Sequence, residues 1–267
     1  MITYIKSQLA PFYSPQEATD LAFWILEETT GLSHAHISAG KDTQNISNIE
    51  IILQRLRKKE PIQYIFGHTL WFGLDLLVNS ATLIPRPETA ELVDWVLQTM
   101  PSNQPLSVLD VGTGSGCIAI GLKQRRPNWQ VTGLDISHEA LDIAKQNAIR
   151  NKVNIHWLQQ DIFSGFTRTF DIIVSNPPYI LNSEKSSMES NVLDYEPHAA
   201  LFVPDDDPLR FYRRICSMKS AKFVFFEVNE RYAEQVAHLL RIHSYDDIQI
   251  KRDIYEKPRM VSGRIKE

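Results

Sequence analysis

Short apolar runs alternate with longer segments of helical periodicity from residue 106 to the end of the chain. The apolar runs have the length of buried strands, and the longer segments place apolar residues three and four positions apart. We expect helices between successive strands among the first five, for instance at 139–151. The expected strands lie at 106–111, 130–134, 155–158, 172–175, 223–227, 248–251 and 260–264.

This alternation is typical of an α/β protein, and it predicts a doubly wound, seven-stranded, mostly parallel sheet of the Rossmann-like type. The link between the last two strands is too short for a helical crossover, so we expect these strands to form an antiparallel hairpin. Ligands of such sheets bind at the carboxyl ends of the strands. We therefore expect the site residues to lie where the predicted strands end.

The first sixty or so residues have a different, mainly helical pattern. Ser14, Pro15 and Glu17 form a candidate capping box with a proline in the first turn, and apolar residues at helical spacing follow. Ser47 is a candidate cap for a second helix. This part has no concentration of catalytic residue types, and we expect it to recognise a substrate or to support the fold.

A link joins the helical part to the α/β part. Two short strands are expected in it, at 63–68 and 70–78, because glycines interrupt its runs of apolar and aromatic residues. The expected organisation is a helical N-terminal domain at 1–60, a linker with a short β-hairpin at 61–85, and an α/β domain at 86–267.

Composition and charge narrow the classes of function. The 267 residues are 43% apolar and 22% charged, which is typical of a soluble globular protein with a buried core. The formal net charge of −4 argues against a protein that clamps a long nucleic-acid backbone. Neither a signal peptide nor an apolar run long enough to span a membrane is visible, so we expect a cytoplasmic protein without membrane attachment.

Cysteine and histidine usage indicates no metal centre. The two cysteines do not suggest a disulfide scaffold or a zinc site, and the eight histidines lack the spacing of a helical metal pair. We therefore expect no metal. The expected state is a monomer without stable nucleic-acid binding.

The first strand of the α/β part runs into a glycine-rich loop. Gly112, Gly114 and Gly116 stand between this strand and an apolar helix start, as in nucleotide-type sites. The pattern G-x-G-x-x-G needs a further glycine where Cys117 stands, so a dehydrogenase is disfavoured. An ATP-binding P-loop motif is also missing from the sequence. Asp110, just before the loop, would repel a phosphate and favour a cationic ligand.

Two further acids follow the next two strands. Asp135 stands about 20 residues past the glycine loop, where such folds place the acid that binds ribose hydroxyls. Asp161 follows the third strand and could accept a hydrogen bond from the amine of adenine, while Ile162 could cover the ring. Each acid could instead be a cap or a turn residue, although Ser137 competes with Asp135 as the cap of the following helix.

The fourth strand ends in Asn176, Pro177, Pro178 and Tyr179. The side-chain oxygen of Asn176 and the main-chain oxygen of Pro177 can accept both hydrogen bonds of a planar NH2 group, which frees its delocalised lone pair for attack. The prolines stiffen the turn, and Tyr179 offers a face on which a planar group can stack. The alternative is an ordinary turn, because Asn and Pro are frequent in turns.

Together these motifs resemble those of class I S-adenosylmethionine-dependent methyltransferases. A closer resemblance is to the HemK/PrmC family, which methylates the side-chain amide nitrogen (N5) of the glutamine in the Gly-Gly-Gln motif of class I peptide chain release factors. The resemblance extends from about residue 60 to the C-terminus. The segments that carry it are 60–67, 72–73, 83–89, 110–116, 175–180 and 195–197, with Ala200 and Leu201.

The resemblance implies a methyltransferase that uses S-adenosylmethionine as cofactor and release factors as protein substrates, and that modulates translation termination. It implies catalytic roles for Asn176, Pro177 and Tyr179, and a substrate-binding role for these residues and Pro178. The expected cofactor-binding residues are Asp110, Gly112, Thr113, Gly114, Ser115, Gly116, Asp135, Asp161, Ile162 and Asn176. Departures from the family pattern at 207–209, 219–222 and 227–231 are expected to lie outside the chemistry.

Two other functions remain open at this point. A nucleic-acid methyltransferase acting on an exocyclic amine of adenine or guanine would use the same motif, with Tyr179 stacking a flipped base. The net charge of −4 and the helical N-terminal part argue against it. A non-catalytic binding module would need neither the glycine loop nor the Asn-Pro-Pro-Tyr sequence.

Overall fold

The computed structural model describes residues 1–40, 46 and 48–266. The chain divides into two compact units, Met1–Gly67 with Glu189–Tyr195, and His68–Met188 with Glu196–Glu267. Among the described residues, none of the helices combines the length and the apolar character needed to cross a membrane.

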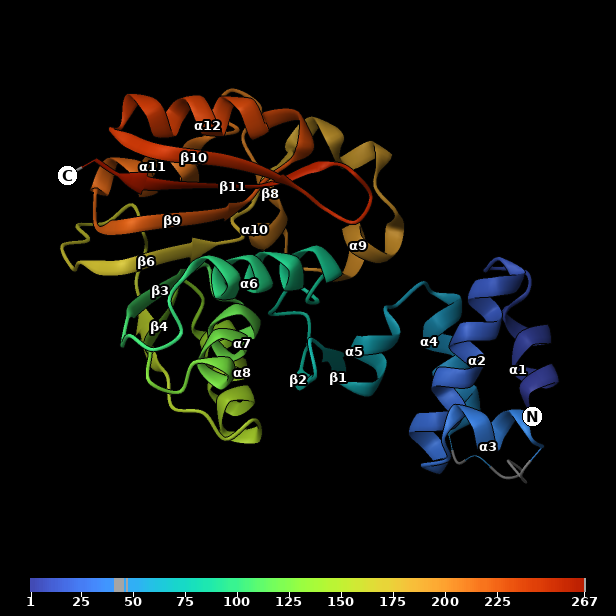
Figure 1. The fold of residues 1–267 in the computed structure, drawn as a ribbon. Helices are drawn as coiled ribbons and strands as arrows, with labels where there is room; N and C mark the ends of the chain where they lie inside the picture. Colours follow the sequence, from blue (N-terminus) through green and yellow to red (C-terminus); the bar gives the residue numbers. More distant parts are fainter. Residues whose placement is uncertain (41–45, 47, 267) are drawn as a thin grey trace. The chain divides into compact units, whose positions relative to one another are not determined.

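The first unit is helical (Figure 1). The capping box expected at Ser14 is confirmed, since its hydroxyl accepts from the Glu17 N–H at 3.3 Å and the Glu17 carboxylate accepts from the Ser14 N–H at 2.9 Å. Ser47, the other expected cap, lies outside the described residues. The helices of this unit are α1 (Ile2–Leu9), α2 (Pro15–Thr30), α3 (His34–Ser38), α4 (Ile49–Arg57), α5 (Ile62–Phe66) and α9 (Ser190–Tyr195).

The strand expected at 63–68 is wrong, because these residues are mostly helical. Helix α5 follows Pro61 and ends at Gly67, which is left-handed with φ 78°. The hairpin lies farther along, where β1 (His68–Trp71) pairs antiparallel with β2 (Leu74–Leu77). The single strand expected at 70–78 is therefore also wrong, because a turn at 72–73 divides it between β1 and β2. A short apolar and aromatic run fits a buried helical turn as well as a strand, so periodicity could not separate them.

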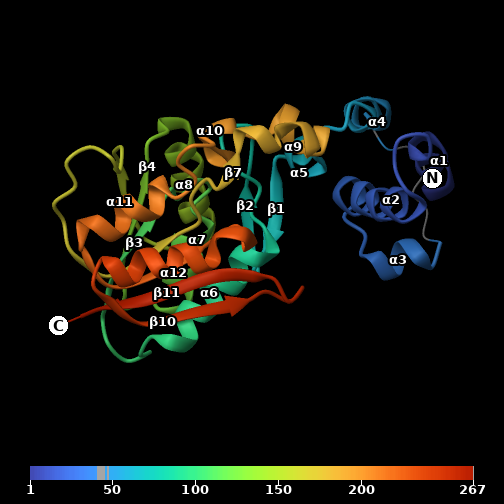
Figure 2. The same ribbon diagram turned by 90° about the horizontal axis from the view of Figure 1, so that it is seen from above.

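The second unit is built on a seven-stranded sheet with the order β10-β11-β9-β6-β3-β4-β5 (Figures 1 and 2). Strands β3, β4, β5, β6 and β9 are parallel, whereas β11 is antiparallel to both β9 and β10. The predicted doubly wound sheet and its antiparallel hairpin are therefore confirmed. The strands are β3 (Ser107–Val111), β4 (Gln130–Asp135), β5 (His156–Gln159), β6 (Phe170–Ser175), β9 (Ala221–Glu227), β10 (Tyr245–Arg252) and β11 (Pro258–Ile265).

Helices cover both faces of this sheet (Figure 1). Successive strand residues point to opposite faces, so Val108 joins the core beneath α6 and α7 while Leu109 joins the core beneath α11 and α12. The helices of this unit are α6 (Pro87–Thr99), α7 (Cys117–Arg125), α8 (His138–Arg150), α10 (His198–Leu201), α11 (Arg210–Met218) and α12 (Ala233–Ile242). Smaller elements are β7 (Ile180–Leu181), β8 (Phe202–Val203) and the 3-10 helices η1 (Asn182–Ser187) and η2 (Glu230–Tyr232).

The expectation of a helix in every link among the first five strands is wrong in one place. Residues 160–169, all of which the structure describes, connect β5 to β6 as a loop and a turn without a helix. A helical crossover needs more residues than this link contains. The chain instead passes from the edge strand β5 to β6, which lies on the other side of β3.

Candidate functional site

The carboxyl ends of the neighbouring strands β6, β3, β4 and β5 lie side by side. Val111 pairs with Leu134 on one side and with Ser175 on the other, while Asp135 pairs with Gln159. The segments that follow these strands are the glycine loop, the Asn-Pro-Pro-Tyr turn and the loop that begins at Gln160. The structure therefore brings the predicted site residues to one edge of the sheet, as expected for a doubly wound fold.

The glycine loop exposes its main chain. Gly112, Gly114 and Gly116 have φ values of 72°, 54° and 81°. A β-carbon built on Gly112 or Gly114 would meet no atom of the described chain within 4 Å, so both residues border open space. At Gly116 a β-carbon would lie 3.1 Å from the Trp157 ring, which gives this glycine a packing role. The first two positions thus allow a ligand to approach the main chain closely.

Asp110 is completely buried beneath this loop. Its Oδ2 accepts hydrogen bonds from the Thr113 hydroxyl at 2.5 Å and the Ala119 N–H at 3.2 Å. Its Oδ1 has no hydrogen-bond partner among the residues that the structure describes. Burial raises the pKa of this carboxyl to about 7, against the effect of the two hydrogen bonds. A ligand ammonium group would give Oδ1 a donor and favour the ionised carboxylate, so the residue fits a cationic ligand.

Asp135 faces the same loop from the end of β4. Its Oδ2 accepts from the Gly114 N–H at 2.9 Å, and its Oδ1 accepts from the Ser137 N–H at 3.0 Å. Each carboxylate oxygen can still accept another hydrogen bond. Burial raises the pKa of Asp135, and the main-chain hydrogen bonds oppose that shift. Ser137 caps α8 by accepting from the Ala140 N–H at 3.1 Å, so the cap belongs to Ser137 and not to Asp135.

Asp161 and Ile162 lie in the loop after β5. The Asp161 carboxylate accepts from the Phe163 N–H at 2.9 Å, which is the local turn that the sequence left open as an alternative. Ile162 is buried, and its main-chain oxygen accepts from Arg214 at 2.7 Å. The loop is thus held in place from α11.

The Asn-Pro-Pro-Tyr turn follows β6. The Nδ2 group of Asn176 donates to the Thr89 hydroxyl oxygen at 3.1 Å, and the Tyr179 hydroxyl donates to Glu227 Oε1 at 3.2 Å. Pro177 is buried, whereas Asn176 and Tyr179 are half-buried. Both ends of the turn are therefore anchored by side chains from other elements.

Sequence reasoning did not assign a site role to Thr89 or Glu227. Thr89 lies in the first turn of α6, and its hydroxyl donates to Glu227 Oε2 at 2.7 Å. Glu227 ends β9 and is buried, although the segment that it begins was expected to lie outside the chemistry. Burial raises the pKa of Glu227 to about 7, against the hydrogen bonds from Thr89 and Tyr179. The strand-end position of Glu227 is the sequence signal that could have found it.

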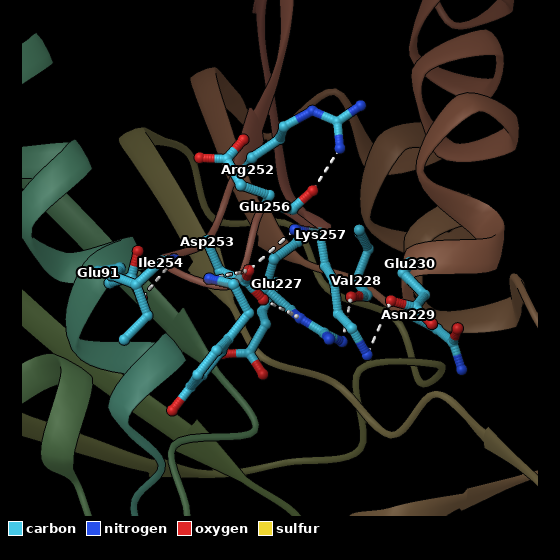
Figure 3. A network of polar contacts seen from close by, with 12 residues as sticks. Glu91, Glu227, Val228, Asn229, Glu230, Arg252, Asp253, Ile254, Glu256 and Lys257 are labelled. Atoms are coloured by element: carbon cyan, nitrogen blue, oxygen red, sulfur yellow. Dashed lines mark hydrogen bonds and ion pairs between the residues drawn. The ribbon is translucent and has the colours of Figure 1, made fainter.

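Glu227 borders a second polar network at the turn between β10 and β11, part of which Figure 3 shows. Arg259 donates to the fully buried carboxylate of Asp253 at 3.2 Å and to the main-chain oxygen of Val228 at 3.3 Å. These contacts fix the guanidinium of Arg259. Its positive charge opposes the rise that burial causes in the pKa of Glu227.

Two of the sequence motifs meet at an ion pair between the half-buried Arg86 and the buried Glu196. The Glu196 carboxylate binds the Arg86 guanidinium and also accepts from the Ile84 N–H at 3.2 Å. The Trp71 indole donates to the main-chain oxygen of Arg86 at 2.7 Å. These bonds hold the segment that leads into α6, and they therefore support the position of Thr89.

Solved structures share the fold of this chain. The catalytic domain of hMettl16 in complex with a MAT2A 3'UTR hairpin has a TM-score of 0.59 and 17% identity, over 73% of this chain and 77% of that one. A human methyltransferase 10 domain containing protein has a TM-score of 0.56 and 18% identity, over 76% of this chain and 96% of that one. Identities this low show the fold alone.

Sequence relatives are much more similar. The release factor glutamine methyltransferase of Bacteroides thetaiotaomicron is 42% identical over 272 residues, with 97% of each chain covered. That of Flavobacterium psychrophilum is 39% identical over 274 residues, covering 97% of this chain and 96% of the relative. The family described as methyltransferase small domain matches residues 93–194. Because the similarity extends over nearly the whole length of these relatives, the chain belongs to the release factor glutamine methyltransferase family.

Proposed function

We propose that this protein transfers a methyl group from S-adenosylmethionine to the side-chain amide nitrogen of the glutamine in the Gly-Gly-Gln motif of class I peptide chain release factors. Family membership supports the reaction and the acceptor. The observation in the fold that carries the proposal is the anchored turn from Asn176 to Tyr179, which lies beside the glycine loop at one edge of the sheet.

The glycine loop and the acids near it fit this cofactor. Bound S-adenosylmethionine supplies an electrophilic methyl group attached to its positively charged sulfur. Asp110 would bind the ammonium group through its unpartnered oxygen, and Asp135 would accept hydrogen bonds from the ribose hydroxyls. Asp161 and Ile162 would bind the adenine. The loop itself, with Thr113, Ser115 and the three glycines, would border the cofactor, and Asn176 would contact it from the neighbouring turn.

The residues of the turn would hold the acceptor. Asn176 Oδ1 and the main-chain oxygen of Pro177 would accept hydrogen bonds from the glutamine NH2 group, while Pro178 and Tyr179 would pack against its plane. The amide nitrogen becomes positively charged as it takes the methyl group, and the two oxygens would stabilise that charge. The N-protonated product amide is strongly acidic and loses its proton to water, so no dedicated base is required.

The helical unit is proposed to recognise the release factor. It has its own buried core, formed by residues such as Leu26 and Leu53, and can present a surface without contributing to the chemistry. The proposed substrate places the reaction in the cytoplasm, and the proposed active form is a monomer.

The test is methyl transfer from radiolabelled S-adenosylmethionine to a purified class I release factor, beside a copy whose Gly-Gly-Gln glutamine is changed. We expect label on the unchanged factor only. Label on both factors would contradict the proposed acceptor. Label on neither, with transfer to tRNA, rRNA or DNA instead, would replace the proposal with a nucleic-acid methyltransferase.

A further inference from the structure

A chain of hydrogen bonds connects a buried carboxylate to the side chain of Asn176. The Thr89 hydroxyl donates to Glu227 Oε2 at 2.7 Å, and Asn176 Nδ2 lies 3.1 Å from Thr89 Oγ1. Thr89 and Glu227 are only 3% and 1% exposed, so the link between them is shielded from solvent. The three residues come from α6, β9 and the turn after β6.

The donors and acceptors in this series of hydrogen bonds follow from the protons that each group carries. An ionised carboxylate only accepts hydrogen bonds, so Glu227 takes the single hydroxyl proton of Thr89. Thr89 Oγ1 can then only accept from Asn176, and the donor of an asparagine side chain is its Nδ2 group. The Oδ1 oxygen of Asn176 is consequently turned away from Thr89.

We propose that Thr89 and Glu227 are positioning residues, which orient the Asn176 amide so that its oxygen, and not its NH2 group, is presented to the acceptor nitrogen. This inference rests on the proposed function, in which Asn176 Oδ1 accepts a hydrogen bond from the glutamine NH2 group. The two orientations of an asparagine amide have nearly the same shape, so packing alone selects between them poorly. The reversed orientation would place a donor against a donor.

The same carboxylate anchors the other end of the turn. Glu227 Oε1 accepts from the Tyr179 hydroxyl at 3.2 Å. Glu227 therefore holds Tyr179 directly and Asn176 through Thr89, so one buried charge sets both ends of the segment that would bind the acceptor.

The orientation depends on the charge of Glu227. A protonated Glu227 could donate to Thr89, whose own proton would then turn toward Asn176 and favour the reversed amide. Burial raises the pKa of Glu227 to about 7, and the negative charge of Glu88 acts in the same direction. The hydrogen bonds from Thr89 and Tyr179 and the positive charge of Arg259 lower the pKa.

One more group reaches Glu227 from α11. The Tyr212 hydroxyl donates to the main-chain oxygen of Glu227 at 3.0 Å, so it does not bind the carboxylate. Because a protonated Glu227 favours the reversed amide of Asn176, we expect kcat to decrease as the pH falls below about 7. With both substrates saturating, this decrease is independent of cofactor affinity.

Thr89→Val is the first test, because it keeps the shape of the side chain and removes the hydroxyl. We expect kcat for transfer to a release factor to fall about 100-fold, because a small misplacement of the reacting groups can lower the rate by this factor. The affinity for S-adenosylmethionine, measured by calorimetry, should change far less than kcat, and Thr89→Ser should restore most of kcat. Thr99→Val is the matched control, since Thr99 lies at the exposed end of the same helix and its hydroxyl donates to the Trp95 main-chain oxygen at 2.8 Å.

Glu227→Gln tests the role of the charge. The amide cannot ionise, so we expect a lower kcat that no longer changes around pH 7, while the control Glu230→Gln keeps the wild-type profile. A Glu227→Gln profile that still follows that of the wild type would contradict the role of this carboxylate.

The side-chain amide signals of Asn176 give a readout that needs no acceptor. In a proton–nitrogen correlation spectrum, these signals are identified by their loss in Asn176→Ala. They should move in Thr89→Val and stay in place in Thr99→Val. Unmoved signals in Thr89→Val, or a kcat equal to that of the wild type, would overturn the positioning role. If the wild type itself fails to label the release factor, the proposed function fails, and the spectra still decide the positioning.

Discussion

Asn147 in α8 donates a hydrogen bond to the main-chain oxygen of Ser115, 2.9 Å away, and so holds the glycine loop from behind. The same NH2 group donates to the Leu77 main-chain oxygen at 2.9 Å, and Asn147 Oδ1 accepts from the Leu77 N–H at 2.6 Å. Asn147 is completely buried. One side chain therefore links the loop, the helix and the β1–β2 hairpin.

Asn147→Ala should loosen the cofactor loop. It leaves the buried main-chain oxygen of Ser115 and the half-buried main-chain groups of Leu77 without this partner. A buried polar group that loses its partner costs about 1–3 kcal/mol. We expect a lower melting temperature and a weaker affinity for S-adenosylmethionine, measured by calorimetry well below that temperature. Gln146→Ala, at an exposed neighbouring position of α8, should change neither quantity. Unchanged affinity in Asn147→Ala would show that the loop keeps its form without this contact.

Asp135→Ala should weaken cofactor binding directly. The variant removes the carboxylate proposed to bind the ribose hydroxyls and frees the Gly114 N–H. Hydrogen bonds to charged groups contribute about 1.5–3 kcal/mol each, so the dissociation constant should rise about 10- to 100-fold. Calorimetric titration with S-adenosylmethionine measures this change, with the half-exposed Asp142→Ala as control. An equal affinity in the two variants would remove Asp135 from the proposed site.

Asn176→Ala should affect turnover far more than cofactor affinity. It removes one of the two oxygens proposed to stabilise the charge on the acceptor nitrogen, and the loss of one such contact lowers kcat by about 100- to 1000-fold. Single-turnover methyl transfer to a release factor measures the chemical step. The exposed Asn154→Ala should retain the wild-type rate. A wild-type rate in Asn176→Ala would place the catalytic contacts elsewhere.

Asp110→Asn should stabilise the cofactor-free protein increasingly as the pH rises. The pKa of Asp110 is about 7 in the folded protein against an ordinary value of 3.8, so between these pH values the folded state binds more protons than the unfolded state. Folding stability is therefore lost as the pH rises from about 4 to 7. Asparagine avoids this loss, because its oxygen can accept from Thr113 and Ala119 without ionising.

Thermal melting without cofactor at pH 5 and pH 8 tests this prediction. The gain in melting temperature of Asp110→Asn over the wild type should be larger at pH 8, while the affinity for S-adenosylmethionine should fall. A gain that is the same at both pH values would mean that the buried carboxyl does not titrate in this range.

The sheet and the positions of the expected cofactor residues were predictable, because both are encoded locally. Strands β3, β6 and β9 contain short apolar runs, and Asp135 and Asn176 are recognisable as polar residues at the ends of expected strands. The errors arose where local signals were ambiguous. The residues of α5 had the composition of a strand, and the link from β5 to β6 was too short for the helix that the alternating pattern suggested.

The partners of Asn176 were beyond the reach of local patterns. Thr89 lies 87 positions before Asn176 and 138 positions before Glu227. The sequence around Thr89 predicts neither contact. The packing of α6 against the end of β9 brings these residues together, and burial then requires each polar group to find a partner. The chain sequence thus specifies which residues follow each strand, whereas the orientation of the Asn176 amide is set by long-range packing and the satisfaction of buried hydrogen bonds.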